Sequence, residues 1–92
     1  MLGLRLARLA DRDLLHIVDV VSDRDAGVAG QSLDRIDRAI LMLRDFPEAG
    51  VAAPHLGRGR RTFAVPPWTI HYRATPDRLM VIRLLDGRRR PR

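Results

Sequence analysis

The sequence predicts an α+β fold in which a helical hairpin covers one face of a mainly antiparallel sheet, with the elements in the order β-α-α-β-β-β. Three observations support this prediction: a strand-like alternation at the start, two amphipathic helical patterns in the first half, and three strand-like segments in the second half. Apolar residues recur every second position in a half-buried strand and every three to four positions in an amphipathic helix. Elements that each bury one face pack in layers, so the expected domain has a helical layer and a sheet layer.

The first strand and the first helix are predicted within the opening 21 residues. Leucine occupies alternate positions from Leu2 to Leu6, which is the period of a strand. The apolar residues of 14–21 then recur at three-four spacing, and Asp11 and Asp13 are placed to cap the first turn of this helix.

A second, longer helix is predicted to follow and to end before Pro47. Its apolar stripe runs from Ala29 to Leu43, with charged residues on the remaining surface. Two antiparallel helices joined by the short polar stretch 22–25 would form a helical hairpin.

The second half of the chain predicts a loop and then a three-stranded meander. Glycines and a proline mark the loop at 50–59, and the strand candidates are roughly Arg61–Val65, Trp68–Ala74 and Arg78–Leu85. The proline pair at 66–67 and a Thr-Pro-Asp sequence at 75–77 separate the strands, as expected of turns.

Alternation predicts which side chains face the helices. In the central strand these are Trp68, Ile70 and Tyr72, and in the last strand Met80, Ile82 and Leu84. The residues expected to point away from the helices are Thr69, His71, Arg73, Leu79, Val81, Arg83 and Leu85. We therefore expect His71, Arg73 and Arg83 to meet on an uncovered, basic sheet face, with Arg5 and either Arg60 or Arg61 at its margins.

Length and charge support one small domain, residues 1–92, with a basic C-terminal tail at about 88–92. The chain has 92 residues and a net charge of +6. Residues 1–48 hold seven arginines and nine acidic residues, whereas residues 49–92 hold ten arginines and two acidic residues. Every basic side chain is arginine, which binds phosphates and carboxylates in a bidentate way.

Several classes of function are disfavoured. Without cysteine the chain has no disulfide, thiolate nucleophile or zinc-thiolate site. Its three histidines are too scattered to suggest a metal site, and no cofactor motif or strong catalytic motif is present. No apolar run approaches the length of a membrane span, and charges interrupt any signal-like start, so the expected location is the cytoplasm.

Four segments together resemble the ParE/RelE family of bacterial type II toxins. They are DFPEAG at 45–50, HLG at 55–57, IHYR at 70–73 and VIRLLDGRR at 81–89. The resemblance implies the RelE/ParE-like fold and a small toxin that arrests growth and is neutralised by an antitoxin. Within this family, RelE-like members cleave messenger RNA on the ribosome, and ParE-like members poison DNA gyrase.

The nuclease activity would need a base, an acid and cations around the reacting phosphate. RelE-like enzymes place an arginine early in the central strand and a tyrosine after a Gly-Lys/Arg-Arg element. Here Thr69 stands at the first position and no tyrosine follows Gly87. A substitute catalytic set is left for this alternative: His71, Arg73, Arg83 and Arg89.

The ending of the chain is more similar to the ParE branch, in which inhibition is a binding event that needs no catalytic residue. The predicted target-binding residues are Arg61, Arg73, Arg83, Arg88 and Arg89. The predicted contacts of a ParD-like antitoxin are Leu33, Ile36, Ile40, Arg73 and Arg83, in an oligomeric complex. The partners would then be this antitoxin and DNA gyrase, or the ribosome and mRNA in the nuclease alternative. A third possibility is a non-toxic basic module that binds nucleic acid or the antitoxin; no metal, cofactor or membrane is expected in any of the three.

Overall fold

The computed structural model describes residues 2–22 and 26–87 and confirms the predicted α+β architecture. The elements are β1 (Gly3–Leu6), α1 (Arg8–Ser22), α2 (Ala26–Asp45), the 3-10 helix η1 (Pro47–Ala49), β2 (Val51–Ala52), the 3-10 helix η2 (Pro54–Leu56), β3 (Arg60–Val65), β4 (Trp68–Ala74) and β5 (Arg78–Asp86). The sequence did not predict the two-residue strand β2 or the 3-10 helices η1 and η2.

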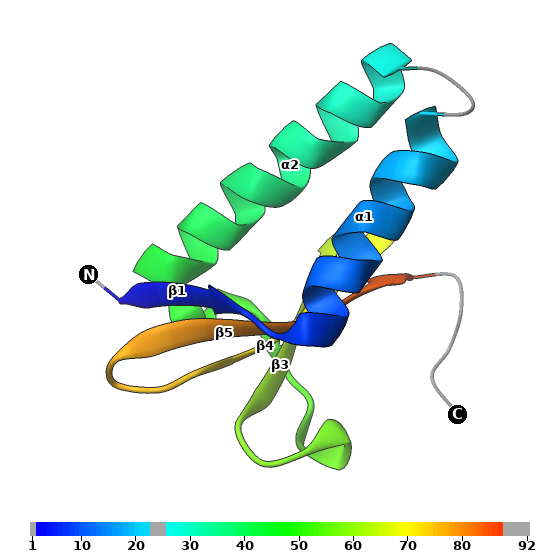
Figure 1. Ribbon diagram of the computed structural model, residues 1–92. Helices are drawn as coiled ribbons and strands as arrows, with labels where there is room; N and C mark the ends of the chain where they lie inside the picture. Colours follow the sequence, from blue (N-terminus) through cyan, green and yellow to red (C-terminus); the bar gives the residue numbers. More distant parts are fainter. Residues whose placement is uncertain (1, 23–25, 88–92) are drawn as a thin grey trace.

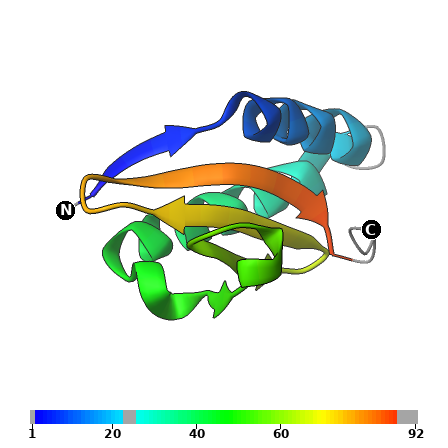
Figure 2. The same ribbon diagram turned by 90° about the horizontal axis from the view of Figure 1, so that it is seen from below.

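The strands form one sheet in the order β1-β5-β4-β3-β2. β1 runs parallel to β5, and the other neighbouring strands are antiparallel. Both helices lie on one side of this sheet, while the loop that carries η2 projects on the other side (Figures 1 and 2). We call the side away from the helices the uncovered face.

The helical layer is held by the apolar stripe predicted for α2. Ile36, Ala39, Ile40 and Leu43 are buried against the sheet, together with Ile17 from α1. Burying such side chains contributes about 1.5–3 kcal/mol each, so this layer supplies much of the stability of a small domain. In the part of the chain that the structure describes, no helix combines the length and apolar character that crossing a membrane requires.

Helix α1 begins earlier than expected, because it starts at Arg8 and the amide of Asp11 already donates to the carbonyl of Ala7 at 3.1 Å. Asp13 therefore lies inside the helix and does not cap its first turn. The carboxylate of Asp13 instead reaches the sheet, where it accepts a hydrogen bond from the backbone N–H of Leu84 at 2.9 Å.

Tyr72 ties the end of the helical layer to the centre of the sheet. Its side chain is fully buried, its hydroxyl donates to the carbonyl of Pro47 at 2.7 Å, and the same oxygen accepts from the N–H of Gly50 at 2.9 Å. A side chain at Gly50 would collide with the Tyr72 ring, so glycine permits this close approach. Both hydrogen-bonding functions of the phenol are thus satisfied.

The predicted alternation of the last strand is wrong in its first half. Leu79 and Val81 are fully buried on the helix side, whereas Met80 and Ile82 are only half-buried. The cause is a shift in register: His71 lies opposite Arg83, but the next residue, Tyr72, lies opposite Val81. Ile82 is therefore the extra residue of a β-bulge, and the alternation changes phase on passing it.

Candidate functional site

The register of the sheet brings three rows of residues together on the uncovered face. The first row is Arg5, Met80, Arg73 and Arg60; the second is Thr62, His71 and Arg83; the third is Ala64, Thr69 and Leu85. We call Arg5, Arg73 and Arg60 the arginine row. Arg73 was predicted to share the face of His71, and this register agrees; of the two alternatives Arg60 and Arg61, it places Arg60 on that face.

Two members of the arginine row stand directly opposite each other without a compensating acid. Arg60 pairs with Arg73 across β3 and β4, and no ion pair among the described residues involves either of them. Like charges placed opposite each other on neighbouring strands are destabilising. Gly59 turns the adjoining loop with a φ of 73°, and a Cβ there would lie 3.4 Å from Cγ and Cδ of Arg73. The loop thus runs beside the arginine row, and a bound anion would relieve its repulsion.

His71 lies at the centre of the uncovered face and is only 8% exposed. Burial lowers its pKa below the ordinary value of 6.5, and the positive charges of Arg60 and Arg83 lower that pKa further, against an opposing effect of Asp13. The imidazole is consequently neutral at pH 7, with one nitrogen able to donate and the other able to accept.

Arg83 is held at the edge of the sheet by Asp13 of α1. Its Nε and one terminal nitrogen donate to the two carboxylate oxygens at 2.8 and 3.0 Å. The pairing of β1 with β5 ends at Val81, so the N–H of Leu84 lies on the unpaired continuation of this edge, where Asp13 accepts it. Asp13 raises the pKa of Arg83 through the hydrogen bonds. This bidentate pair fixes the guanidinium beside His71.

A cavity of about 240 Å³ lies beside His71, between the uncovered face and the segment around η2. Polar groups in its lining come from His55, Thr62, Thr69, His71 and Asp86; the remaining lining residues are Val51, Ala52, Ala53, Leu56, Leu85 and Gly87. Figure 2 shows the η2 segment in front of the sheet. Pockets for drug-sized ligands have volumes of about 300–1,000 Å³, so this cavity suits a single ring system.

The remaining predicted site residues do not gather on this face. Arg61 pairs with Tyr72 and lies on the helix side, where its guanidinium donates to the carbonyl of Gly50 at 2.9 Å. Ile36 and Ile40 are buried in the core, and Leu33 is half-buried on α2. Arg88 and Arg89, with the rest of the predicted basic tail, lie outside the described residues.

No cluster of three or more histidine or acidic side chains with metal-binding geometry occurs in residues 2–22 and 26–87. The chemistry that the uncovered face does offer is hydrogen bonding by hydroxyls and imidazoles beside fixed positive charge. Such a surface suits anionic partners such as phosphodiesters or carboxylates.

Comparison with known proteins identifies the family of this chain. Residues 4–91 match the family model described as the ParE toxin of the type II toxin–antitoxin system parDE. The chain belongs to the ParE toxin family. Toxin ParE3 of Caulobacter vibrioides is 37% identical over 70 residues, which cover 76% of this chain and 70% of that protein.

The fold of this ParE-family toxin also matches a solved structure. A chain from the structure titled "Chromosomal ParDE TA system from P. aeruginosa" superposes with a TM-score of 0.78, covering 94% of this chain and 96% of that chain at 21% identity. The predicted family and fold are therefore confirmed.

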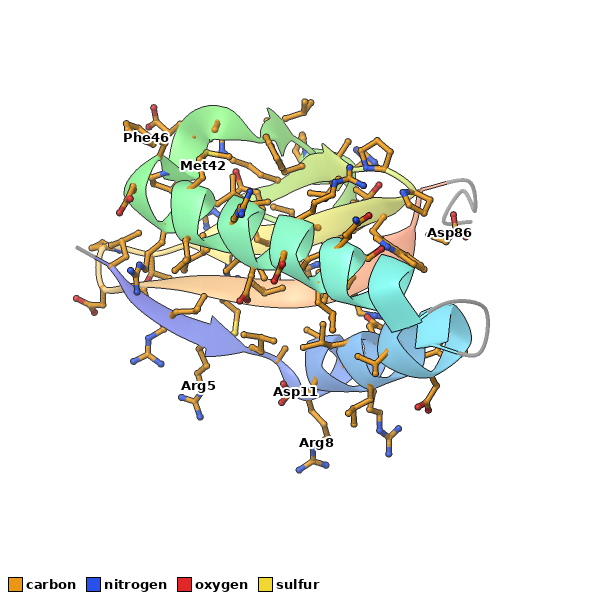
Figure 3. All side chains as sticks on the ribbon, turned by 90° about the horizontal axis from the view of Figure 1, so that it is seen from above. Arg5, Arg8, Asp11, Met42, Phe46 and Asp86 are labelled. Atoms are coloured by element: carbon orange, nitrogen blue, oxygen red, sulfur yellow. The ribbon has the colours of Figure 1, made fainter. Side chains whose placement is uncertain are left out.

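The ParE-family toxin has a second surface feature, on the helix side. An apolar hollow of about 640 Å³ is lined by Met42, Phe46, Pro47, Ala49 and the acidic Asp45 and Glu48. Phe46 is 66% exposed, and Figure 3 shows it beside Met42 at one corner of the molecule. An exposed aromatic side chain directly before a proline, just after a helix, is the sequence signal that could have indicated this corner.

Sequence reasoning missed three contributors to the site: Asp13, Thr62 and the segment around η2. Asp13 was assigned to helix capping because its contact with Arg83 spans 70 residues of sequence. Thr62 could have been found from the alternation of β3, since it lies opposite His71. No local pattern signals that η2 folds back over the sheet.

Proposed function

We propose that this ParE-family toxin acts by binding DNA gyrase and that a ParD-like antitoxin neutralises it. The match of residues 4–91 to the parDE toxin model carries this proposal. Gyrase poisoning is the activity that the ParE resemblance implies, and it needs a binding surface and no catalytic residue. In this proposal the toxin works in the cytoplasm, where gyrase acts.

Charge supports the arginine row as part of the gyrase-binding surface. Arg60 and Arg73 face the same side without partners among the described residues, beside the neutral His71. Gyrase carries DNA, so a surface with unpaired arginines would be attracted to the enzyme–DNA complex. We also keep Arg88 and Arg89 as proposed gyrase-binding residues. Of the other predicted residues, Arg61 is hydrogen-bonded to Gly50 on the helix side and Arg83 is paired with Asp13.

The antitoxin proposal rests on the same charge. An acidic antitoxin segment would neutralise Arg73 and shield the uncovered face from the target. Three apolar residues of α2 were predicted to contact the antitoxin. Ile36 and Ile40 are buried in the core, whereas Leu33 is half-buried and therefore partly accessible. Co-purification tests this: reversal of Arg73, Arg83, Arg88 and Arg89 to Glu should release the antitoxin. Undiminished binding would show that charge does not hold the pair together.

One expression experiment separates the proposed activities. The chain is produced with and without the neighbouring reading frame, and growth, gyrase supercoiling, gyrase-linked DNA breaks and transcript integrity are measured together. Gyrase poisoning predicts growth arrest, loss of supercoiling and stalled breaks, with intact transcripts and rescue by the neighbour. Harmless expression would instead support the non-toxic binding module.

Ribosome-dependent mRNA cleavage stays as the second candidate because His71 lies directly opposite Arg83 and two residues from Arg73. A neutral imidazole next to a fixed guanidinium can accept a proton while the cation stabilises a phosphorane-like charge. This candidate predicts transcript cleavage that His71→Ala reduces. The same variant would leave gyrase inhibition largely intact if the histidine contributes only binding.

A further inference from the structure

We propose that the uncovered face binds one unpaired nucleotide, with its phosphate on the arginine row and its base in the cavity beside η2. The proposal rests on one juxtaposition: two arginines that form no ion pair with any described residue, a buried histidine, and a ring-sized cavity whose lining includes hydroxyls and imidazoles, all on adjoining rows of one sheet face. This inference deepens the proposed action on gyrase, and it relies on that action only for the source of the nucleotide, which is cut DNA held by the enzyme.

The phosphate end of the site is set by register. Arg60 and Arg73 lie opposite each other, and His71 lies diagonally from Arg60 and two residues before Arg73. Two guanidinium groups on one side of a phosphodiester can each donate two parallel hydrogen bonds. Binding an anion there removes the repulsion between these arginines, so the arrangement of the arginine row favours an anion.

The base end of the site is set by the cavity. Thr62 and Thr69 each offer a hydroxyl that both donates and accepts, which suits the mixed edge of a nucleobase. His55 and His71 provide planar rings of the kind on which unstacked bases pack. Leu56 and Leu85 give the cavity apolar walls, as expected for a planar ring and not for an extended peptide, and the acidic Asp86 also lies in the lining.

The arginine row and the cavity adjoin each other on the sheet face, as the phosphate and the base do in a nucleotide. His71 is shared, since it lines the cavity and lies within the field of Arg60. A carboxylate-bearing peptide would use the arginines but leave the hydroxyl-lined cavity unfilled. Duplex DNA would use the arginines but keep its bases stacked out of reach. An unpaired nucleotide is the ligand that uses both ends together.

Binding of short fluorescent oligonucleotides to the full-length chain tests the proposal. A pentadeoxynucleotide should bind, and a strand of the same length in which every nucleotide is abasic, which keeps all the phosphates, should bind about 10-fold more weakly, the effect of losing one stacked base. Equal binding of the abasic strand, or of a duplex of the same sequence, would overturn the proposal. So would equally tight binding of an oligoglutamate peptide of matched charge.

Variants then assign the two ends of the site. Thr62→Val and Thr69→Val keep the β-branched shape and should each weaken the intact strand about 2- to 10-fold without affecting the abasic strand. Arg60→Gln and Arg73→Gln should weaken both strands and lower the slope of log K against log salt by about 0.7 each.

The matched control is Arg8→Gln, which removes the same charge from the outer edge of α1, where Figure 3 shows Arg8 pointing away from the sheet. Arg8→Gln should leave the preference for the intact over the abasic strand, and the slope of log K against log salt, near their wild-type values. If Arg8→Gln weakened binding as much as Arg60→Gln or Arg73→Gln, net charge alone would explain the binding and the site would be refuted. Thermal unfolding of every variant shows that each one is folded, and the abasic comparison on the wild-type chain needs no variant.

An RNA strand of the same sequence distinguishes the source of the nucleotide. Tighter binding of DNA supports the link to gyrase-bound DNA, and tighter binding of RNA overturns it. Gyrase inhibition is measured separately on the same proteins. If Thr69→Val abolishes the preference for the intact strand over the abasic strand, and the wild-type chain does not inhibit gyrase, the nucleotide site stands and the proposed target fails. If the wild-type chain inhibits gyrase but Thr69→Val leaves that preference unchanged, the site alone is rejected.

Discussion

The helix-covered face and the uncovered face of this sheet treat buried polar groups in opposite ways. On the covered face Tyr72 is fully buried, and its hydroxyl is paired with both Pro47 and Gly50. On the uncovered face His71 is almost as deeply buried but lies among arginines, two of which have no ion pair in the described residues. Satisfied groups stabilise a fold, whereas uncompensated charge costs stability and is kept where a ligand can complete it.

The largest expected difference concerns the apolar side of α2. Leu43→Ala should lower the free energy of unfolding by about 2–5 kcal/mol, because Leu43 is fully buried and its truncation leaves a cavity. Leu41→Ala is the matched control: it lies on the same helix but is 45% exposed, so its cost should stay below about 1 kcal/mol. Urea denaturation measures both. Equal losses would mean that α2 does not pack against the sheet through its Leu43 stripe.

The next effect concerns the satisfied polar group of the covered face. Tyr72→Phe should cost about 1–3 kcal/mol, since it leaves the carbonyl of Pro47 and the N–H of Gly50 without their partner. The same urea titration reports this loss. An unchanged midpoint would show that water replaces the phenol, and the contrast between the two faces would then lose its main support.

The contact that joins the two layers comes third. Asp13→Asn should destabilise the fold by about 1–2 kcal/mol, because the amide keeps one oxygen for Leu84 but loses the charge-assisted pair with a partly exposed Arg83. Asp19→Asn, on the exposed surface of the same helix, should change stability by less than about 0.5 kcal/mol. If Asp13→Asn lowered the free energy of unfolding as little as Asp19→Asn, the Asp13–Arg83 pair would contribute no more than an ordinary surface salt bridge.

Lowering the pH should sharpen the comparison through His71. Its pKa is lowered in the folded state by burial and by the charges of Arg60 and Arg83, so the unfolded chain binds this proton more readily. Stability should therefore decline as the pH falls below about 6.5, and His71→Gln should decline less. His16→Gln, which removes an exposed histidine of α1, is the control and should follow the wild type. Identical pH profiles for His71→Gln and wild type would contradict the assigned environment.

The smallest effect on stability is expected in the arginine row. Arg73→Gln should leave the free energy of unfolding unchanged or raise it by up to about 0.5 kcal/mol, since it removes a like charge opposite Arg60. The same change should weaken binding of anionic partners, which separates function from folding. A clear loss of stability would mean that Arg73 has a structural role and would remove the contrast with Tyr72.

Much of the fold could be predicted from local pattern because the helices and β4 each have one mainly apolar face. The stripe of α2 and the alternation of β4 from Trp68 to Arg73 identified the covered and uncovered faces correctly. The pattern of β5 misled because a bulge at Ile82 inserts one residue, and such an insertion depends on the neighbouring strand. The pattern of β3 left Arg60 and Arg61 as alternatives for the uncovered face, and the predicted target-binding residue Arg61 lies opposite Tyr72 on the covered face, since the register of β3 was uncertain by one residue.

The sequence by itself determined the family, the order of the two helices and the four longer strands, and the concentration of positive charge in the second half, since these depend on residue type and local spacing. Only the tertiary structure decided that Arg60 and Arg73 oppose each other, that Asp13 holds Arg83, and that η2 folds over Thr62 and Thr69 to form a cavity. These contacts join residues distant in the chain, and local propensity carries no information about which distant partners the packed layers bring together.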